Sequence, residues 1–124
     1  MGYLPTHVKV HLREADCLIL ESNHDVEMLK VGPYPWLVKQ RVLSKYGHLS
    51  NNAVSEYLAD SDAVTGFNPH VRFLVLAHLS QENNNPFAAE ISAREALNRR
   101  PAESAFNGEL LIASQAVPMR PLEL

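Results

Sequence analysis

Two short apolar runs constrain the fold of this chain more than any other feature. They span Cys17–Glu21 and Val71–Ala77, and each is followed by polar residues. Continuous apolar runs of this length predict parallel strands that are covered on both faces. Segments with helical patterns precede, separate and follow the two runs. This alternation predicts an α/β fold in which helical crossovers connect parallel strands.

Residues that are typical of helix starts and stops bound the helical segments. We expect helices over about 6–16, 25–30, 35–46, 50–60 and 86–98, started by Thr6, Asp25, Pro35, Ser50 and Asn85-Pro86. Gly47 can end the third helix in a left-handed cap. Val54, Tyr57 and Leu58 are predicted to face the core. Glu109–Ala113 and Ala116–Met119 are candidate strands, and prolines make the second an edge strand or a tail.

The composition indicates a small globular protein. The chain has 124 residues, of which 46% are hydrophobic and 20% charged, and its formal net charge is -3. Lys and Arg gather loosely at 39–45 and at 94–100, which we interpret as solvated helix faces rather than a nucleic-acid patch. Cys17 is the only cysteine, so the chain needs no oxidising compartment. Because no apolar run is long enough for a signal peptide or a membrane span, we expect a cytoplasmic protein.

Polar side chains at the ends of the apolar runs are the candidate site residues, and each has two interpretations. His78 follows the second run and is either a metal ligand or acid–base group, or a cap on its own strand. His48 lies between a glycine and a helix start, where the helix dipole would keep it neutral, or it is an ordinary loop histidine. Glu21 ends the first run and either orients a histidine or faces solvent. His24 and Asp25 form a site pair, or Asp25 simply caps a helix, which we prefer.

Three motifs contain these residues. They are Glu-Ser-Asn-His-Asp at 21–25, Gly-His-Leu-Ser-Asn at 47–51 and Leu-Ala-His-Leu-Ser-x-Glu-Asn-Asn at 76–84. Together they resemble the C-terminal half of the metallo-β-lactamase-fold hydrolases. With Gly-Pro-Tyr-Pro-Trp at 32–36, they are most similar to the YycJ/WalJ-type bacterial proteins, which are related to ribonuclease Z. The resemblance covers essentially the whole chain, from residue 2 to about residue 124.

The resemblance implies a zinc-dependent hydrolase, a nuclease or phosphodiesterase that acts on nucleic acid or another phosphodiester. The complete family fold holds two zinc ions. By this resemblance His78 is a zinc ligand, His48 protonates the leaving group and Glu21 orients His48. Asn23, His24 and Asp25 match a motif of the YycJ-type branch and are candidate site-lining residues without an assigned role. The residue types suit the reaction, which needs a metal to activate water and an acid for the departing oxygen.

The chain departs from the family pattern in its metal ligands. The N-terminal half of the family carries His-x-His-x-Asp-His, a further histidine and a bridging aspartate, and none of these is present in the sequence. Gly2-Tyr3 matches the pair that follows the bridging aspartate. We therefore expect 1–124 to form a single partial domain, the C-terminal αβ half of an αββα sandwich. Such a half would expose the apolar face of its sheet, and His78 alone would not hold zinc tightly.

These observations leave two main functional interpretations. In the first, the chain is part of a zinc-dependent nuclease or phosphodiesterase, and in isolation it has little or no activity. In the second, it is a truncated, non-catalytic remnant that self-associates or pairs with a missing N-terminal half. A free-standing domain that binds a small molecule is a third, weaker interpretation. In none of the three do we expect a membrane partner.

Overall fold

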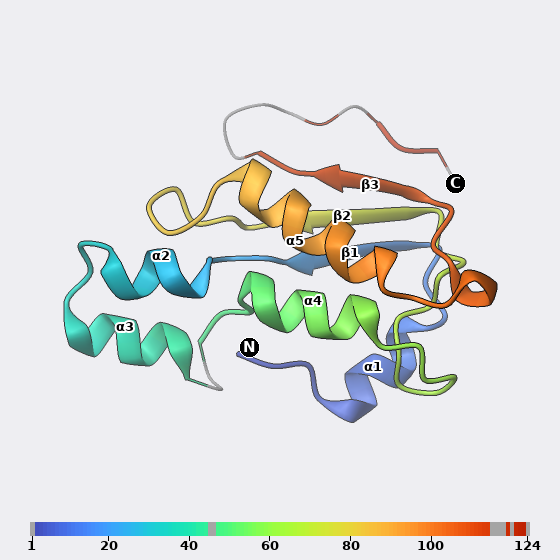
Figure 1. The fold of residues 1–124 in the computed structure, drawn as a ribbon, viewed down its shortest axis with the longest axis horizontal. Helices are drawn as coiled ribbons and strands as arrows, with labels where there is room; N and C mark the ends of the chain where they lie inside the picture. The colour runs from blue at the N-terminus through green and yellow to red at the C-terminus, as the bar shows by residue number, and fades with distance from the viewer. Residues whose placement is uncertain (1, 45–46, 115–118, 120, 124) are drawn as a thin grey trace.

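A three-stranded parallel sheet forms the centre of the structure, a computed structural model that describes residues 2–44, 47–114, 119 and 121–123 (Figure 1). Its strands are β1 (Cys17–Glu21), β2 (Phe73–Ala77) and β3 (Glu109–Ile112), in the order β1-β2-β3. Both neighbouring pairs are parallel. The predicted α/β fold is confirmed.

Two crossover helices cover one face of this sheet. Helix α4 (Asn51–Ala59) lies in the connection from β1 to β2, and α5 (Pro86–Asn98) connects β2 to β3. The two helices pack against each other over the same face (Figure 1). Crossovers are nearly always right-handed, so a strand order that runs in one direction places both helices on one side. The core lies between these layers and includes the buried residues Leu18, Leu20, Leu74, Leu76, Leu110, Val54, Leu58, Ala89, Ala93 and Ala96.

The opposite face of the sheet is largely open. Ile19 on the edge strand β1 is 66% exposed, and Phe73 and Leu111 are half-buried. Val75 is buried on this face because it lies on the central strand, between its register partners Ile19 and Leu111. The prediction that Cys17–Glu21 is covered on both faces is therefore wrong. An open apolar face agrees instead with a sheet that forms one half of a sandwich.

The other helices lie around the edges of these layers. Helix α1 (Thr6–Leu12) lies beside β1 and α4, and a short 3-10 helix, η1, spans Ala102–Ser104. Helices α2 (Val26–Val31) and α3 (Trp36–Leu43) extend beyond the carboxyl ends of the strands (Figure 1). Within the described residues, no helix combines the length and the apolar character that a membrane crossing requires.

The predicted helix caps are partly correct. The side chains of Asp25, Ser50 and Asn85 accept hydrogen bonds from the backbone N–H groups of the first turns of α2, α4 and α5, as expected. Two predictions are wrong. Helix α1 starts after Pro5 rather than at a Thr6 cap and ends before Arg13. Helix α3 ends at Leu43, and Gly47 does not adopt a left-handed conformation. The candidate strand Ala116–Met119 lies, apart from Met119, outside the described residues.

Candidate functional site

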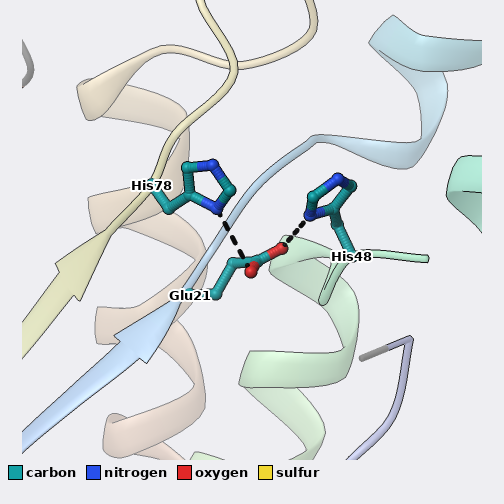
Figure 2. A group of neighbouring side chains, drawn as sticks. All are labelled: Glu21, His48 and His78. Atoms are coloured by element: carbon teal, nitrogen blue, oxygen red, sulfur yellow. Dashed lines mark hydrogen bonds and ion pairs between the residues drawn. The ribbon is translucent and has the colours of Figure 1, made fainter. Parts of the chain in front are cut away.

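The carboxylate of Glu21 lies between two histidines at the carboxyl edge of the sheet (Figure 2). Its Oε1 lies 2.7 Å from His48 Nδ1, and its Oε2 lies 3.2 Å from His78 Nδ1. The two imidazole rings meet edge to face, with their centroids 5.3 Å apart. The side chains are 23% exposed for Glu21, 42% for His48 and 57% for His78. The three candidate residues therefore form one solvent-accessible cluster.

The fold brings these residues together from three separate segments. Glu21 is the last residue of β1, and its register partner Ala77 immediately precedes His78 at the end of β2. Parallel strands end at the same edge of a sheet, so residues that follow them become neighbours. His48 comes from the segment that leads into α4, which is held against β1 by a hydrogen bond from Asn23 N to Leu49 O. A second hydrogen bond, from Asn51 N to His24 O, joins the same two segments. Strand register and these backbone contacts thus assemble the cluster.

The geometry fixes which nitrogen of each imidazole faces outward. An ionised carboxylate can only accept hydrogen bonds, so a neutral His48 ring carries its proton on Nδ1, facing Glu21. The 3.2 Å approach of His78 Nδ1 to the same carboxylate favours the same tautomer for a neutral His78. Each Nε2 then keeps its lone pair for a metal ion or a proton. Within the described residues, Glu21, His48 and His78 form a group of candidate ligands whose donor atoms lie within 4.8 Å of one another. Imidazole and carboxylate donors fit zinc, but three are the minimum for a site, and that count includes Glu21 itself.

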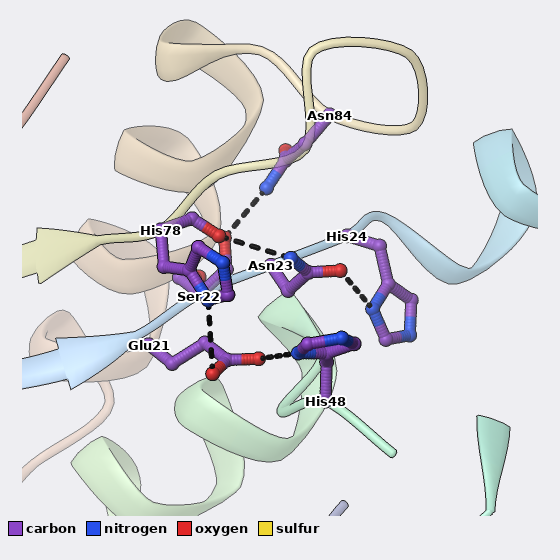
Figure 3. A network of polar contacts seen from close by, with 7 residues as sticks. All are labelled: Glu21, Ser22, Asn23, His24, His48, His78 and Asn84. Carbon is purple, nitrogen blue, oxygen red and sulfur yellow. Dashed lines mark hydrogen bonds and ion pairs between the residues drawn. The ribbon is translucent and has the colours of Figure 1, made fainter. Parts of the chain in front are cut away.

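His78 has an unusual backbone conformation. Its φ of 55° lies in the left-handed region, which costs energy for most residues other than glycine. Asn23 Nδ2 donates a hydrogen bond to His78 O over 3.0 Å and thereby holds this conformation (Figure 3). Asn23 O also accepts a hydrogen bond from Ser80 N. Asn23 therefore ties the exit of β1 to the loop that carries His78.

His24 and Asp25 do not face the cluster as a pair. Asp25 caps α2 by accepting a hydrogen bond from Met28 N. His24 is only 1% exposed, and its Nδ1 lies 3.3 Å from Asn23 Oδ1. Burial lowers the pKa of His24, and the neighbouring His48 lowers it further. Of the three candidate site-lining residues, Asn23 alone lines the cavity described below.

A network of buried side-chain amides lies behind the cluster. Ser22 Oγ donates to Asn51 Oδ1 over 2.6 Å, and Asn51 Nδ2 donates to Asn84 Oδ1 over 2.9 Å. Asn84 Nδ2 donates to Ser22 O over 2.8 Å, a contact drawn in Figure 3, and this bond closes a ring of the three residues. All three residues are at least 96% buried. The ring joins the exit of β1, the start of α4 and the loop after β2, which are the three segments that carry Glu21, His48 and His78.

A polar cavity of about 320 Å³ lies beside the two histidines. One wall is formed by Asn23, His48, His78 and the loop that follows β2. Tyr34, before α3, and Val42, within it, also line the cavity. Its volume is at the lower end of the range for small-molecule sites. The cavity can therefore hold a small group, such as one end of a longer substrate, against the histidines.

The sequence interpretation assigned no role to several residues that build this site. It missed the amide network of Ser22, Asn51 and Asn84, and it missed Tyr34 in the cavity wall. The signal was present in part, because these polar residues lie within the three motifs or within Gly-Pro-Tyr-Pro-Trp. Their contacts were not predictable, since each hydrogen bond of the ring joins segments at least 29 residues apart.

Comparisons with known proteins identify relatives of the chain. It is 39% identical over 99 residues to "Exodeoxyribonuclease YycJ" of Bacillus anthracis, a match that covers 80% of this chain and 36% of the relative. It is also 39% identical over 83 residues to "Exodeoxyribonuclease WalJ" of Streptococcus pneumoniae, which covers 67% of this chain and 29% of that relative. No family model matches the chain, and no solved structure matches it.

The chain spans about a third of the length of these curated relatives. The identity is nevertheless high and extends over most of this chain, and the parallel sheet with its helices is consistent with one half of a metallo-β-lactamase fold. Over the residues matched, the chain is thus similar to the YycJ/WalJ-type proteins of the metallo-β-lactamase family.

Proposed function

We propose that this chain contributes part of the active site of a metal-dependent exodeoxyribonuclease. The observation that carries the proposal is the Glu21 carboxylate, which contacts His48 and His78 and leaves both Nε2 atoms facing outward. The names of the YycJ and WalJ relatives support DNA as the substrate class. The proposal includes a cytoplasmic location, where such a protein would meet DNA.

Each residue of the cluster has a distinct role in this proposal. His48 donates a proton to the oxygen that leaves the cleaved phosphodiester, and Glu21 orients the ring and stabilises its protonated form. His78 presents Nε2 as a metal ligand, with its tautomer set by the same carboxylate. A bound zinc ion would neutralise charge on the phosphate and activate the attacking water. The cavity next to His48 and His78 would receive the end of the DNA strand.

Zinc binding by the purified chain tests the metal part of the proposal. We expect weak binding by calorimetry, because the cluster offers at most three ligands. His78→Asn should abolish this binding, and asparagine is the suitable replacement because it tolerates the left-handed conformation of residue 78. His70→Asn, at an exposed loop histidine, is the matched control. Equal zinc affinity for the chain and for His78→Asn would contradict the assignment.

Hydrolysis of end-labelled single-stranded DNA, with added zinc, tests the catalytic part. We expect little or no activity from the chain alone, because its hold on the metal is weak. Any mononucleotide release should depend on added metal and decrease by roughly 100-fold or more in His48→Asn. Near-stoichiometric zinc retained through purification, together with rapid hydrolysis, would contradict the expected low activity. Release that His48→Asn leaves unchanged would contradict the role of His48.

The open sheet face supports a second candidate function, as a non-catalytic association domain. Ile19 is 66% exposed on this face, and Phe73 and Leu111 are partly exposed beside it. Exposed apolar surface of this kind is typical of protein contacts. In this proposal the face packs against a second copy of the chain or against the remaining part of a longer YycJ/WalJ-type protein. Light scattering over a range of concentrations tests self-association, and a monomer at every concentration would argue against a second copy.

A further inference from the structure

Helices α2 and α3 form an arm (residues 26–43) that stands apart from the packed layers (Figure 1). Leu29 is the only buried residue of α2, and α3 contributes none of its eight residues to the interior. Lys39 Nζ donates a hydrogen bond to Lys30 O over 2.7 Å and joins the two helices. The arm is therefore held mainly by its own contacts and by its base.

The base of the arm is fixed directly beside the histidine cluster. Asp25 N donates to Asn83 O over 2.8 Å, next to the loop that carries His78. Gly32, at the far end of α2, also lies close to this loop, because a Cβ at this position would lie 2.6 Å from Asn83 Oδ1. Tyr34 and Val42 of the arm line the same cavity as His48 and His78. Residues of the arm therefore form part of the cavity wall.

The arm exposes apolar side chains that its own packing does not use. Trp36 is 65% exposed, Leu37 is 77% exposed and Val31 is 84% exposed. Trp36 is the first residue of α3 and lies two residues after Tyr34, which lines the cavity. An exposed indole is a suitable platform for stacking on a nucleic-acid base.

The charge of the arm is opposite to that of the whole chain. The described residues 26–44 carry three basic side chains, Lys30, Lys39 and Arg41, against one acidic side chain, Glu27, whereas the chain has a formal net charge of -3. By themselves Lys39 and Arg41 indicated only a solvated helix face. Lys39 lies on α3 one turn after the exposed Trp36, on the arm that lines the cavity through Tyr34 and Val42. This changes the interpretation, because proteins hold single strands with aromatic platforms and basic side chains.

We propose that the arm binds single-stranded DNA as it leaves the cavity, with Trp36 stacked on a base and Lys39 and Arg41 against phosphates. This inference rests on the proposed function, since it takes DNA as the substrate class. It gives the Gly-Pro-Tyr-Pro-Trp segment a role in holding the DNA strand, which is separate from the role of the histidine cluster in hydrolysis. The recognition is independent of base sequence, because every base offers a face for stacking.

The fluorescence of Trp36 reports on this binding directly, because it is the only tryptophan of the chain. A 12-residue oligothymidylate is titrated into the purified chain, with a chelator present so that no cleavage occurs. We expect saturable quenching that coincides with the rise in anisotropy of the labelled oligonucleotide. Trp36→Ala should weaken binding measured by anisotropy by about 5-fold or more, and Trp36→Phe should restore most of it. Because Trp36 is exposed, circular dichroism of both variants should match that of the parent chain.

Charge variants test the phosphate contacts separately. Lys39→Gln and Arg41→Gln should each weaken binding and reduce the slope of log affinity against log salt by about 0.7. Arg94→Gln, which removes an exposed charge from α5, is the matched control and should leave the slope unchanged. If Arg94→Gln has the same effect as Lys39→Gln and Arg41→Gln, the binding reflects total charge and the proposal is wrong.

Other outcomes would also overturn the proposal. Anisotropy that saturates without any change in Trp36 emission would place DNA elsewhere on the chain. A concentration-dependent blue shift without DNA would assign the arm to a second copy, and stronger quenching by anionic phospholipid vesicles would assign it to a lipid surface. DNA that quenches Trp36 and binds the variants as weakly as predicted, but is not hydrolysed when metal is added, would support DNA binding by the arm. The same result would contradict the nuclease proposal. Hydrolysis without quenching would contradict DNA binding by the arm but not the nuclease proposal.

Discussion

At the scale of single residues, the burial of His24 makes the stability of the fold depend on pH. Its ring is 1% exposed behind the cluster, and burial together with His48 lowers its pKa. The unfolded chain therefore takes up a proton at this position more readily than the folded protein. Stability should decrease as the pH falls below the ordinary histidine pKa of about 6.5 and should be recovered as the pH rises through it.

The variant His24→Gln should reduce this pH dependence. The measurement is urea unfolding between about pH 5 and about pH 8, which brackets the ordinary histidine pKa. Exchanging His70 for glutamine is a suitable control, because His70 is exposed in a loop. If the variant and the parent chain lose stability equally on acidification, a group other than His24 is responsible.

Arg100 is a second buried polar residue, and its role is structural. Its guanidinium donates to Leu58 O and Asp60 O over 2.8 Å each, to Phe67 O over 3.0 Å and to Ser104 O over 2.8 Å. It also lies over the ring of Phe67. These bonds satisfy carbonyl groups at the end of α4, in the loop that follows it and at the end of η1.

We predict that Arg100→Lys lowers the free energy of unfolding by roughly 2 kcal/mol or more, because an ammonium cannot reach four separate carbonyl groups. The neighbouring Arg99 is exposed, so Arg99→Lys provides the same chemical change without the buried contacts. Thermal unfolding of the two variants makes the comparison. Similar melting temperatures would show that solvent replaces the lost hydrogen bonds.

At the scale of elements, the amide ring is the device that holds three segments together. The side chain of Asn51 bonds to both Ser22 and Asn84. We predict that Asn51→Ala lowers the free energy of unfolding by about 2 to 3 kcal/mol, because it leaves buried partners unsatisfied. Asn52→Ala changes an exposed residue one position later and should have little effect.

The same pair of variants also tests positioning. In Asn51→Ala, the imidazole resonances of His48 and His78 should shift in nuclear magnetic resonance spectra, because the segments that carry them lose a shared anchor. In Asn52→Ala they should not. Unchanged resonances in Asn51→Ala would limit the ring to a role in stability.

Element types were predictable from the sequence where local signals are strong. The apolar runs identified β1 and β2, and side-chain caps located the starts of α2, α4 and α5. Helix ends that have no side-chain cap were not predictable. Helix α1 has no side-chain cap and ends several residues early, and α3 ends at Leu43 although a glycine lies only four residues beyond. Neither helix has a side-chain cap, so the local sequence carries no strong signal for its bounds.

The candidate site was predictable in part for a similar reason. Positions at strand ends identified Glu21 and His78, because parallel strands bring their carboxyl ends together. The contact between Glu21 and His78 was not predicted, since only His48 had been assigned to that carboxylate. It depends on the left-handed backbone of residue 78, which the sequence pattern does not indicate.

At the scale of the whole molecule, the sheet has one covered face and one open face. We predict that Ile19→Lys reduces self-association, since it places a charge at an exposed apolar position on edge strand β1. Val64 is 60% exposed in a turn away from the sheet, so Val64→Lys is the matched control. Sedimentation at increasing concentration measures the self-association of the two variants. Equal association in both variants would show that contacts form elsewhere.

The open face and the histidine cluster share a residue. Glu21 alternates with Leu20 along β1 and therefore belongs to the same side of the strand as Ile19. A polypeptide that covers Ile19 would also change the surroundings of the Glu21 carboxylate. Metal affinity and partner affinity are then thermodynamically linked, and each ligand must alter the affinity for the other by the same factor.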